Sequence, residues 1–236
     1  IKAKGLFNNG IRTKVEQSTL SPSDLLVCVR YCFGDFNAEN AELGSNIIDS
    51  ILKDSKPDIY DRLRAKFYTS KFIPNKDKNF KTADNAQNMI RVRNTYDELL
   101  EELNSIDGAD KNHYKGISLL KEVLNDYIGF LADYVWPSKN ANPNFAFDLD
   151  ESITRFEKLK DRRLGLEPIG EGLKNWLDPS WVKRGTPIDY RGFCYTYNYI
   201  QRGYEALGRF EESIKFGQMS FTLNSFVGDH NGKQVC

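Results

Sequence analysis

The stretch that decides the fold runs from Asp84 to Trp136 and reads DNAQNMIRVRNTYDELLEELNSIDGADKNHYKGISLLKEVLNDYIGFLADYVW. Two sets of apolar residues recur in it at alternating spacings of three and four. The first set is Met89, Val92, Tyr96, Leu99, Leu103 and Ile106, and the second is Ile117, Leu120, Leu124, Tyr127, Leu131 and Tyr134. This alternation is typical of one face of an amphipathic α-helix, so the stretch predicts two helices.

The two predicted helices are joined by a polar turn, DGADKN, at residues 107–112. Such residues tolerate tight or left-handed backbone, and a short turn makes the helices antiparallel with their apolar faces together. Leu100, Leu119, Val123 and Ile128 lie off these faces and need other neighbours. We therefore expect the hairpin to be the central pair of a bundle, with a supporting role, rather than a free coiled coil.

The rest of the chain also predicts helices. Ser21-Pro22 is a start signal, Gly34 is a stop signal, and a second helix is expected over residues 40–54. Ser55 is expected to cap a third helix, which ends before a loop at 71–81. No run of alternating β-branched residues predicts a strand. The expected fold class is all-α, an antiparallel helical bundle with a C-terminal helix-turn-helix and essentially no β-sheet.

Proline and glycine set the expected boundaries in the second half. Trp136-Pro137 is expected to close the hairpin, because proline restricts the preceding residue and cannot continue a helix. A helix is expected near 148–163, followed by a glycine- and proline-rich segment at 164–188. The predicted organisation is an irregular arm at 1–19, a helical bundle at 20–137, a linker with one or two helices at 138–189, a helical hairpin at 190–227 and a tail at 228–236.

Composition limits the classes of partner. The chain has 33 basic and 33 acidic residues and a formal charge of zero, which removes the strongest reason to expect a nucleic-acid partner or an acidic membrane surface. The longest apolar run, residues 25–29, is far below the ~18 residues of a membrane span. We expect a soluble protein without a nucleic-acid partner, for which peripheral membrane association remains open. The first residue is Ile1, which suggests a processed mature form or part of a longer chain, in an organelle lumen or the cytoplasm.

Residues for catalysis are poorly placed. His113 follows Asp110 by three residues, but the position is a turn, where Asp110 or Asn112 is the natural cap of the next helix. The four cysteines lack a second ligand pair, and no phosphate-binding loop or G-x-S-x-G elbow is present. We predict no catalytic residue, no metal site and no cofactor. An enzyme that uses Asp110 and His113 is the alternative.

Residues 197–214, YNYIQRGYEALGRFEESI, resemble a single tetratricopeptide (TPR) repeat. In that repeat an aromatic, an aliphatic and a tyrosine residue line the first helix, and a small residue lets the second helix pack closely. Tyr197, Ile200, Tyr204 and Ser213 fill these places. The sequence departs from the repeat at three positions, where a small residue, an aromatic and a proline are replaced by Gln201, Gly217 and Ser225.

The resemblance to a TPR repeat implies a role in binding other protein subunits. It places the repeat's usual ligand-facing positions at Tyr195, Asn198, Arg202 and Glu205, where Asn198 and Arg202 would hold a carboxylate or a backbone carbonyl. Aromatic residues are also crowded between positions 190 and 204. They either pack against the segment that holds Trp176 and Trp181 or reach a partner.

The hairpin is also similar to the final helix pair of PsbQ-type proteins. The matching features are Leu99, Leu100, Leu103, Ile106 and Asp107, the polar turn, and the apolar residues from Leu120 to Leu131. This resemblance implies an extrinsic four-helix bundle on the lumenal side of a photosynthetic membrane complex. The primary expectation is a non-catalytic scaffold or adaptor subunit, and the alternatives are the PsbQ-like subunit and an enzyme with an unrecognised site.

Overall fold

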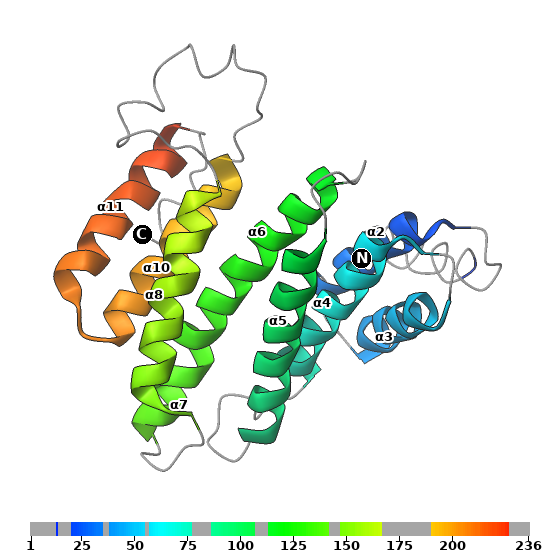
Figure 1. The fold of residues 1–236 in the computed structure, drawn as a ribbon, viewed down its shortest axis with the longest axis horizontal. Helices are drawn as coiled ribbons and strands as arrows, with labels where there is room; N and C mark the ends of the chain where they lie inside the picture. Colours follow the sequence, from blue (N-terminus) through cyan, green and yellow to red (C-terminus); the bar gives the residue numbers. More distant parts are fainter. Residues whose placement is uncertain are drawn as a thin grey trace. The chain divides into compact units, whose positions relative to one another are not determined.

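A computed structural model describes residue 13 and residues 20–34, 38–54, 57–76, 86–106, 113–141, 147–166 and 190–226. Everywhere within these ranges regular structure is helical and no strand occurs, which confirms the all-α fold (Figure 1). None of the helices described is long and apolar enough to cross a membrane. The chain divides into two compact units, one of residues 1–80 and 87–119, the other of residues 81–86 and 120–236.

Unit 1 contains α2 (Pro22–Gly34), α3 (Ala38–Lys53), α4 (Ile59–Lys76), α5 (Ala86–Ser105, from Gln87 onward) and the first turns of α6 (His113–Phe130). Helices α2, α3 and α4 pack against one another in pairs. The core is aliphatic and aromatic, and its fully covered members include Val29, Ile47, Phe67, Met89, Val92 and Leu99. Of the predicted α5 stripe, Met89, Val92, Tyr96 and Leu99 are buried, whereas Leu103 and Ile106 are half-buried.

Three helix boundaries in unit 1 bear on the predictions. Ser21 caps α2 as expected, because its Oγ accepts a hydrogen bond from the backbone N–H of Asp24 at 3.2 Å. The prediction that Ser55 caps the third helix was wrong, since Asp58 accepts from the N–H of Asp61 at 2.8 Å. The loop predicted from residue 71 was also wrong at its start, because α4 continues to Lys76.

Unit 2 contains the rest of α6, the π-helix η2 (Leu131–Val135), α7 (Trp136–Ala141), α8 (Leu149–Gly165), α10 (Tyr190–Ala206) and α11 (Phe210–Phe226). Helix α10 is central, because it packs against both α11 and η2. At two glycines of unit 2, an aromatic ring lies close against the helix backbone. A Cβ atom at Gly129 would lie 2.9 Å from the Tyr199 ring, and one at Gly203 would lie 2.4 Å from the Phe156 ring.

The helix that begins at α6 does not end at Pro137, so that prediction was wrong. It passes through η2, where the N–H of Trp136 donates to the carbonyl oxygen of Leu131, and continues as α7 to Ala141. A proline ring normally clashes with the carbonyl four residues earlier in an α-helix. The wider π turn immediately before Pro137 shifts the backbone pairing by one residue, which lets the helix accommodate the proline.

The turn between α10 and α11 is set by a glycine. Gly208 has φ of +72°, a left-handed conformation that side chains disfavour. The N–H of Arg209 donates to the oxygen of Tyr204 at 2.8 Å, and the N–H of Gly208 donates to the oxygen of Glu205 at 3.0 Å. These are the two bonds of a Schellman motif, which ends α10 and reverses the chain into α11.

The residues predicted to need neighbours beyond the hairpin are all buried. Leu100 and Leu119 are covered in unit 1, and Val123 and Ile128 are covered in unit 2. From Val123 to Phe130, α6 therefore buries apolar residues around most of its circumference. A helix of this kind belongs inside a helical protein and not in an isolated two-helix seam.

Candidate functional site: the α10–α11 surface

The two helices of the C-terminal hairpin share a well-packed inner face. Phe193, Cys194, Tyr197 and Leu223 form a buried cluster, and Leu164, Phe216 and Met219 pack against it. Tyr204 stacks on Phe216 at a centroid distance of 5.6 Å. Three of the crowded aromatic residues of α10, Phe193, Tyr197 and Tyr204, are therefore core, because they are almost completely covered.

The four residues predicted to bind a partner lie along one side of α10, at spacings of three and four. Tyr195 is 58% exposed, Arg202 and Glu205 are exposed, and Asn198 is half-buried. Arg202 already has a carboxylate from its own unit, since its Nη2 lies 2.5 Å from Oδ1 of Asp133. Its guanidinium also lies over the Tyr199 ring, 5.9 Å from the centroid. Arg202 is thus oriented by its contact with η2.

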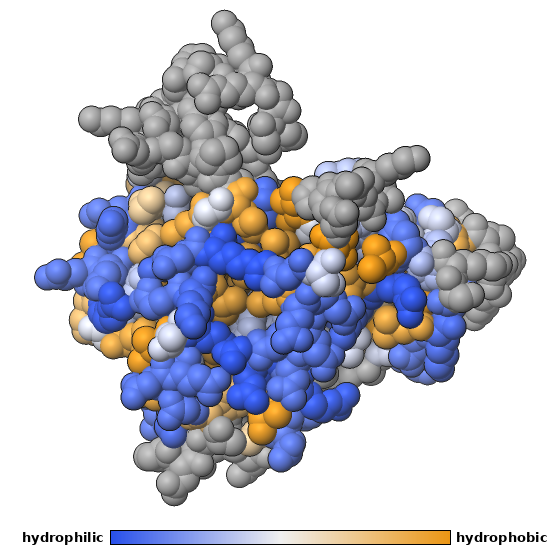
Figure 2. Space-filling model, in the orientation of Figure 1, coloured by the Kyte–Doolittle hydropathy of each residue, from blue (hydrophilic) through white to orange (hydrophobic). Residues whose placement is uncertain are grey.

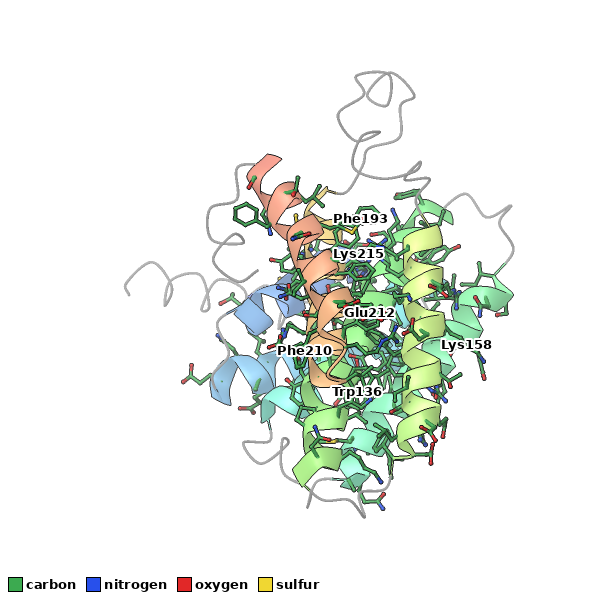
Figure 3. All side chains as sticks on the ribbon, turned by 90° about the vertical axis from the view of Figure 1, so that its left-hand side faces the viewer. Trp136, Lys158, Phe193, Phe210, Glu212 and Lys215 are labelled. Carbon is green, nitrogen blue, oxygen red and sulfur yellow. The ribbon has the colours of Figure 1, made fainter. Side chains whose placement is uncertain are left out.

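Helix α11 exposes apolar residues for which the sequence predicted no role. Phe210 is 64% exposed, Ile214 is 61% exposed and Phe221 is 50% exposed. Their spacing of four and seven places them on one helical face, which we call the α11 stripe. Figure 3 looks onto α11 with Phe210 at its start, and Figure 2 shows apolar residues reaching the surface among polar ones where Figure 1 draws α11.

The α11 stripe borders a groove of about 580 Å³ between α10 and α11. The residues that line this groove are all uncharged: Gln201, Ile214, Gly217, Gln218, Phe221 and Thr222. Gln201 lies between Asn198 and Glu205 on α10, at helical spacings of three and four, so the groove adjoins the predicted partner-facing residues. The stripe, the groove and those α10 residues together make up what we call the α10–α11 surface.

The floor of the groove contains a buried acceptor. Oε1 of Gln201 is covered from solvent and accepts no hydrogen bond. A Cβ atom at Gly217 would lie 3.1 Å from Cδ of Gln201, so the glutamine amide fills the space beside the glycine. A buried amide oxygen without a donor costs about 1–3 kcal/mol.

A charged cluster lies where α8 meets the hairpin. Lys160 Nζ donates to the Tyr204 hydroxyl at 2.9 Å and forms an ion pair with Glu157. Arg209 Nη1 lies 2.7 Å from Glu157 Oε1 and Nη2 lies 2.5 Å from Glu212 Oε1, while the guanidinium covers the Tyr204 ring. These contacts tie α8 to both helices of the hairpin.

The same contacts shift the pKa values of this cluster. Burial lowers the pKa of Lys160, but hydrogen bonds with Glu157 and Tyr204 outweigh burial and raise it well above its usual range. For Glu157, burial raises the pKa, and the bonds and charges of Lys160, Tyr204 and Arg209 outweigh that effect and lower it. A lysine that is held protonated is no nucleophile or general base, so the cluster fits a structural clamp.

The other candidates for chemistry are the histidines, the residues near them and the cysteines. His113 begins α6, but its side chain, and Asp110, Asn112, Trp176, Trp181 and His230, fall outside the described residues. Cys28, Cys32 and Cys194 are thiols that form no disulfide, and burial together with the nearby Cys28 raises the pKa of Cys32 to about 11. In the part of the chain that the structure describes, no three potential metal ligands gather.

Comparisons with known proteins add no family to this picture. No family model, no curated protein and no solved structure matches the chain.

Proposed function

We propose that the protein is a non-catalytic helical adaptor, one subunit of a larger assembly, and that it binds another polypeptide on the α10–α11 surface of unit 2. The observation that carries the proposal is the α11 stripe, in which Phe210, Ile214 and Phe221 are each at least half exposed on one helical face. Helices of globular proteins normally bury such a face, and exposed apolar residues beside a groove are typical of interaction sites.

The polar surroundings support the same function. Asn198, Arg202 and Glu205 supply a donor–acceptor pair and both signs of charge beside the apolar α11 stripe and its uncharged groove, an arrangement like the polar rim of a protein interface. Arg202 is held by Asp133, so little conformational freedom would be lost when a partner contacts it. Tyr195, largely exposed on α10, adds an aromatic side chain of the type enriched at interfaces.

Affinity capture with matched variants tests this function. The tagged protein and the variants Ile214→Lys and Val27→Lys would be used as bait in an extract of the source cells. Both variants place a lysine at an exposed aliphatic position, but Val27 lies on α2 in unit 1 and is 70% exposed. We expect the wild type and Val27→Lys to retain the same proteins, and Ile214→Lys to lose them. Identical captured proteins for all three baits would contradict the proposal.

A further inference from the structure

We propose that Cys28 and Cys32 on α2 form a dithiol site that binds a trivalent arsenical. The two cysteines are four residues apart within one continuous α-helix, so their side chains are neighbours on the same side of it. Both are thiols that form no disulfide. The dithiol site belongs to unit 1, so it does not depend on the function proposed for the α10–α11 surface of unit 2.

The helical spacing of the two thiols favours a bridge through one atom over a direct bond between the sulfurs. Cβ atoms four residues apart on a helix are separated by ~5–6 Å, whereas a disulfide needs a Cβ separation of ~3.5–4.5 Å. Oxidation to a disulfide would therefore require α2 to unwind. An atom that bonds both sulfurs at about the metal–thiolate length of ~2.3 Å spans up to ~4.6 Å between them. The side chains can turn to this sulfur separation while the helix stays intact.

The dithiol site lies at the edge of the buried side of α2. Cys32 is 1% exposed and belongs to the covered side of the helix with Leu26 and Val29, whereas Cys28 is half-buried. Burial, together with the nearby Cys28, raises the pKa of Cys32 to about 11, so the Cys32 thiol is protonated at neutral pH. These surroundings disfavour a net negative charge, and they favour a ligand that neutralises both sulfurs when it binds.

Coordination number and charge select the class of ligand. A structural Zn²⁺ ion takes four protein ligands, and among the residues that the structure describes no three potential ligands gather. A monovalent soft ion such as Cu⁺ would leave a net negative charge on two thiolates, which burial disfavours. Trivalent arsenic that carries one organic group or one hydroxyl bonds two thiolates and is then neutral. Its third substituent can point to solvent on the side of the half-buried Cys28.

The binding reaction is a condensation in which nothing is oxidised or reduced. With phenylarsine oxide, two S–H bonds and the arsenic–oxygen double bond break and two As–S bonds form. The oxygen leaves with both protons as one water molecule. The half-buried Cys28 thiol reacts first, and Cys32 then reacts within the same molecule at a high effective concentration. The bridged adduct should therefore resist an excess of a monothiol, which removes arsenic from a single cysteine.

Mass spectrometry of the intact chain with phenylarsine oxide tests the dithiol site. The full chain with Cys236→Ala would be reduced and then treated with the arsenical in an excess of glutathione. We expect one adduct per chain, with a mass gain of one phenylarsine oxide less one water. Cys194→Ala removes a buried thiol of α10 and should keep the adduct. Cys28→Ala and Cys32→Ala should each raise the apparent dissociation constant by about 100-fold or more, because the second bond is lost.

A variant with one thiol moved around α2 tests the geometry at a constant number of thiols. Val27→Cys combined with Cys28→Ala puts the two thiols five residues apart, and at ~100° per residue they then face different sides of the helix. Position 27 is 70% exposed, so the new thiol is accessible to the arsenical. We expect no adduct that resists glutathione, with an unchanged circular dichroism spectrum as evidence that the variant is folded. Absence of the adduct from the parent chain, or an equally stable adduct in Cys28→Ala or in the Val27→Cys variant, would overturn the proposal.

Discussion

Gln201 and Gly217 occupy a single space across the α10–α11 interface. A Cβ atom at position 217 would lie 3.1 Å from Cδ and 3.3 Å from both terminal atoms of the Gln201 amide. A TPR repeat has a small residue at the position of 201 and an aromatic residue at the position of 217. This chain has a large residue, glutamine, at 201 and the smallest residue, glycine, at 217. The two departures thus compensate each other in volume, and they leave a polar floor beneath the groove.

This relationship predicts that the two positions are energetically coupled. In the wild type, Gly217→Ala should add little or no stability, because contact with the Gln201 amide offsets the gain in helix propensity. In a Gln201→Ala background the same substitution should raise the free energy of unfolding by about 0.5–1 kcal/mol, since only the helix propensity remains. Urea unfolding of the four proteins measures the coupling. Equal effects of Gly217→Ala in both backgrounds would refute it.

Glycine is also required at position 203, because a rigid aromatic ring lies against it. Gly203 on α10 faces Phe156, whose ring atoms would lie 2.4 and 2.6 Å from an added Cβ. Phe156 is fully buried between Trp136 and Tyr204, with ring centroids at 5.1 and 5.3 Å, so it cannot move aside. Gly203→Ala should lower the free energy of unfolding by about 1–3 kcal/mol.

Gly165 on α8 is the matched control for Gly203. An added Cβ there meets nothing within 4 Å, so Gly165→Ala should be neutral or stabilise by up to about 1 kcal/mol. Thermal or urea unfolding of the two variants gives the comparison. If Gly203→Ala is as stable as Gly165→Ala, α10 and α8 are not in the close contact described.

The charged cluster around Glu157 predicts that the fold becomes less stable in acid. Burial raises the pKa of Glu157, but Lys160, Tyr204 and Arg209 together lower it below its ordinary value of 4.5. A carboxyl group whose pKa is lower in the folded state stabilises the fold above pH 4.5, and that contribution disappears as the pH falls through the folded pKa. Glu157→Gln should therefore cost about 1 kcal/mol at neutral pH and much less at acid pH.

Thermal unfolding of wild type and Glu157→Gln across this range provides the measurement. Some acid sensitivity should remain in the variant, because the pKa values of Asp58 and Glu212 are also lowered, through their bonds to Lys115 and Arg209. For Asp58, burial acts in the opposite direction and is outweighed. A constant stability difference between wild type and Glu157→Gln at all pH values would contradict the assignment.

Most of the helical fold could be predicted from the sequence, because periodic apolar residues report directly on local structure. Met89, Val92, Tyr96 and Leu99 are buried as their spacing requires, and Ser21 caps its helix. The prediction failed at Pro137, where the outcome depends on a π turn in the preceding helix. Helix propensity accounts for the cost of a proline in a regular α-helix. It does not account for a preceding π turn that reduces this cost.

The candidate site was predictable only in part. Tyr195, Asn198, Arg202 and Glu205 could be placed on one side of α10 from the resemblance to a repeat, but the pairing of Arg202 with Asp133 depends on packing between α10 and η2. The α11 stripe could have been suspected, because Phe210, Ile214 and Phe221 share a face. Which side of α11 is exposed depends on how α10 packs against it, and the spacing of residues in α11 does not show this.

Photo-crosslinking from the α11 stripe tests the central claim most directly. A benzophenone amino acid would replace Phe221 on α11 in one sample and Tyr114, an exposed aromatic residue of α6 in unit 1, in the other. The two proteins would be irradiated in their native extract and the products identified by mass spectrometry. The account predicts defined cross-links to a polypeptide from position 221 and none from position 114. Cross-links that are absent at 221, or equally abundant at both positions, would contradict it.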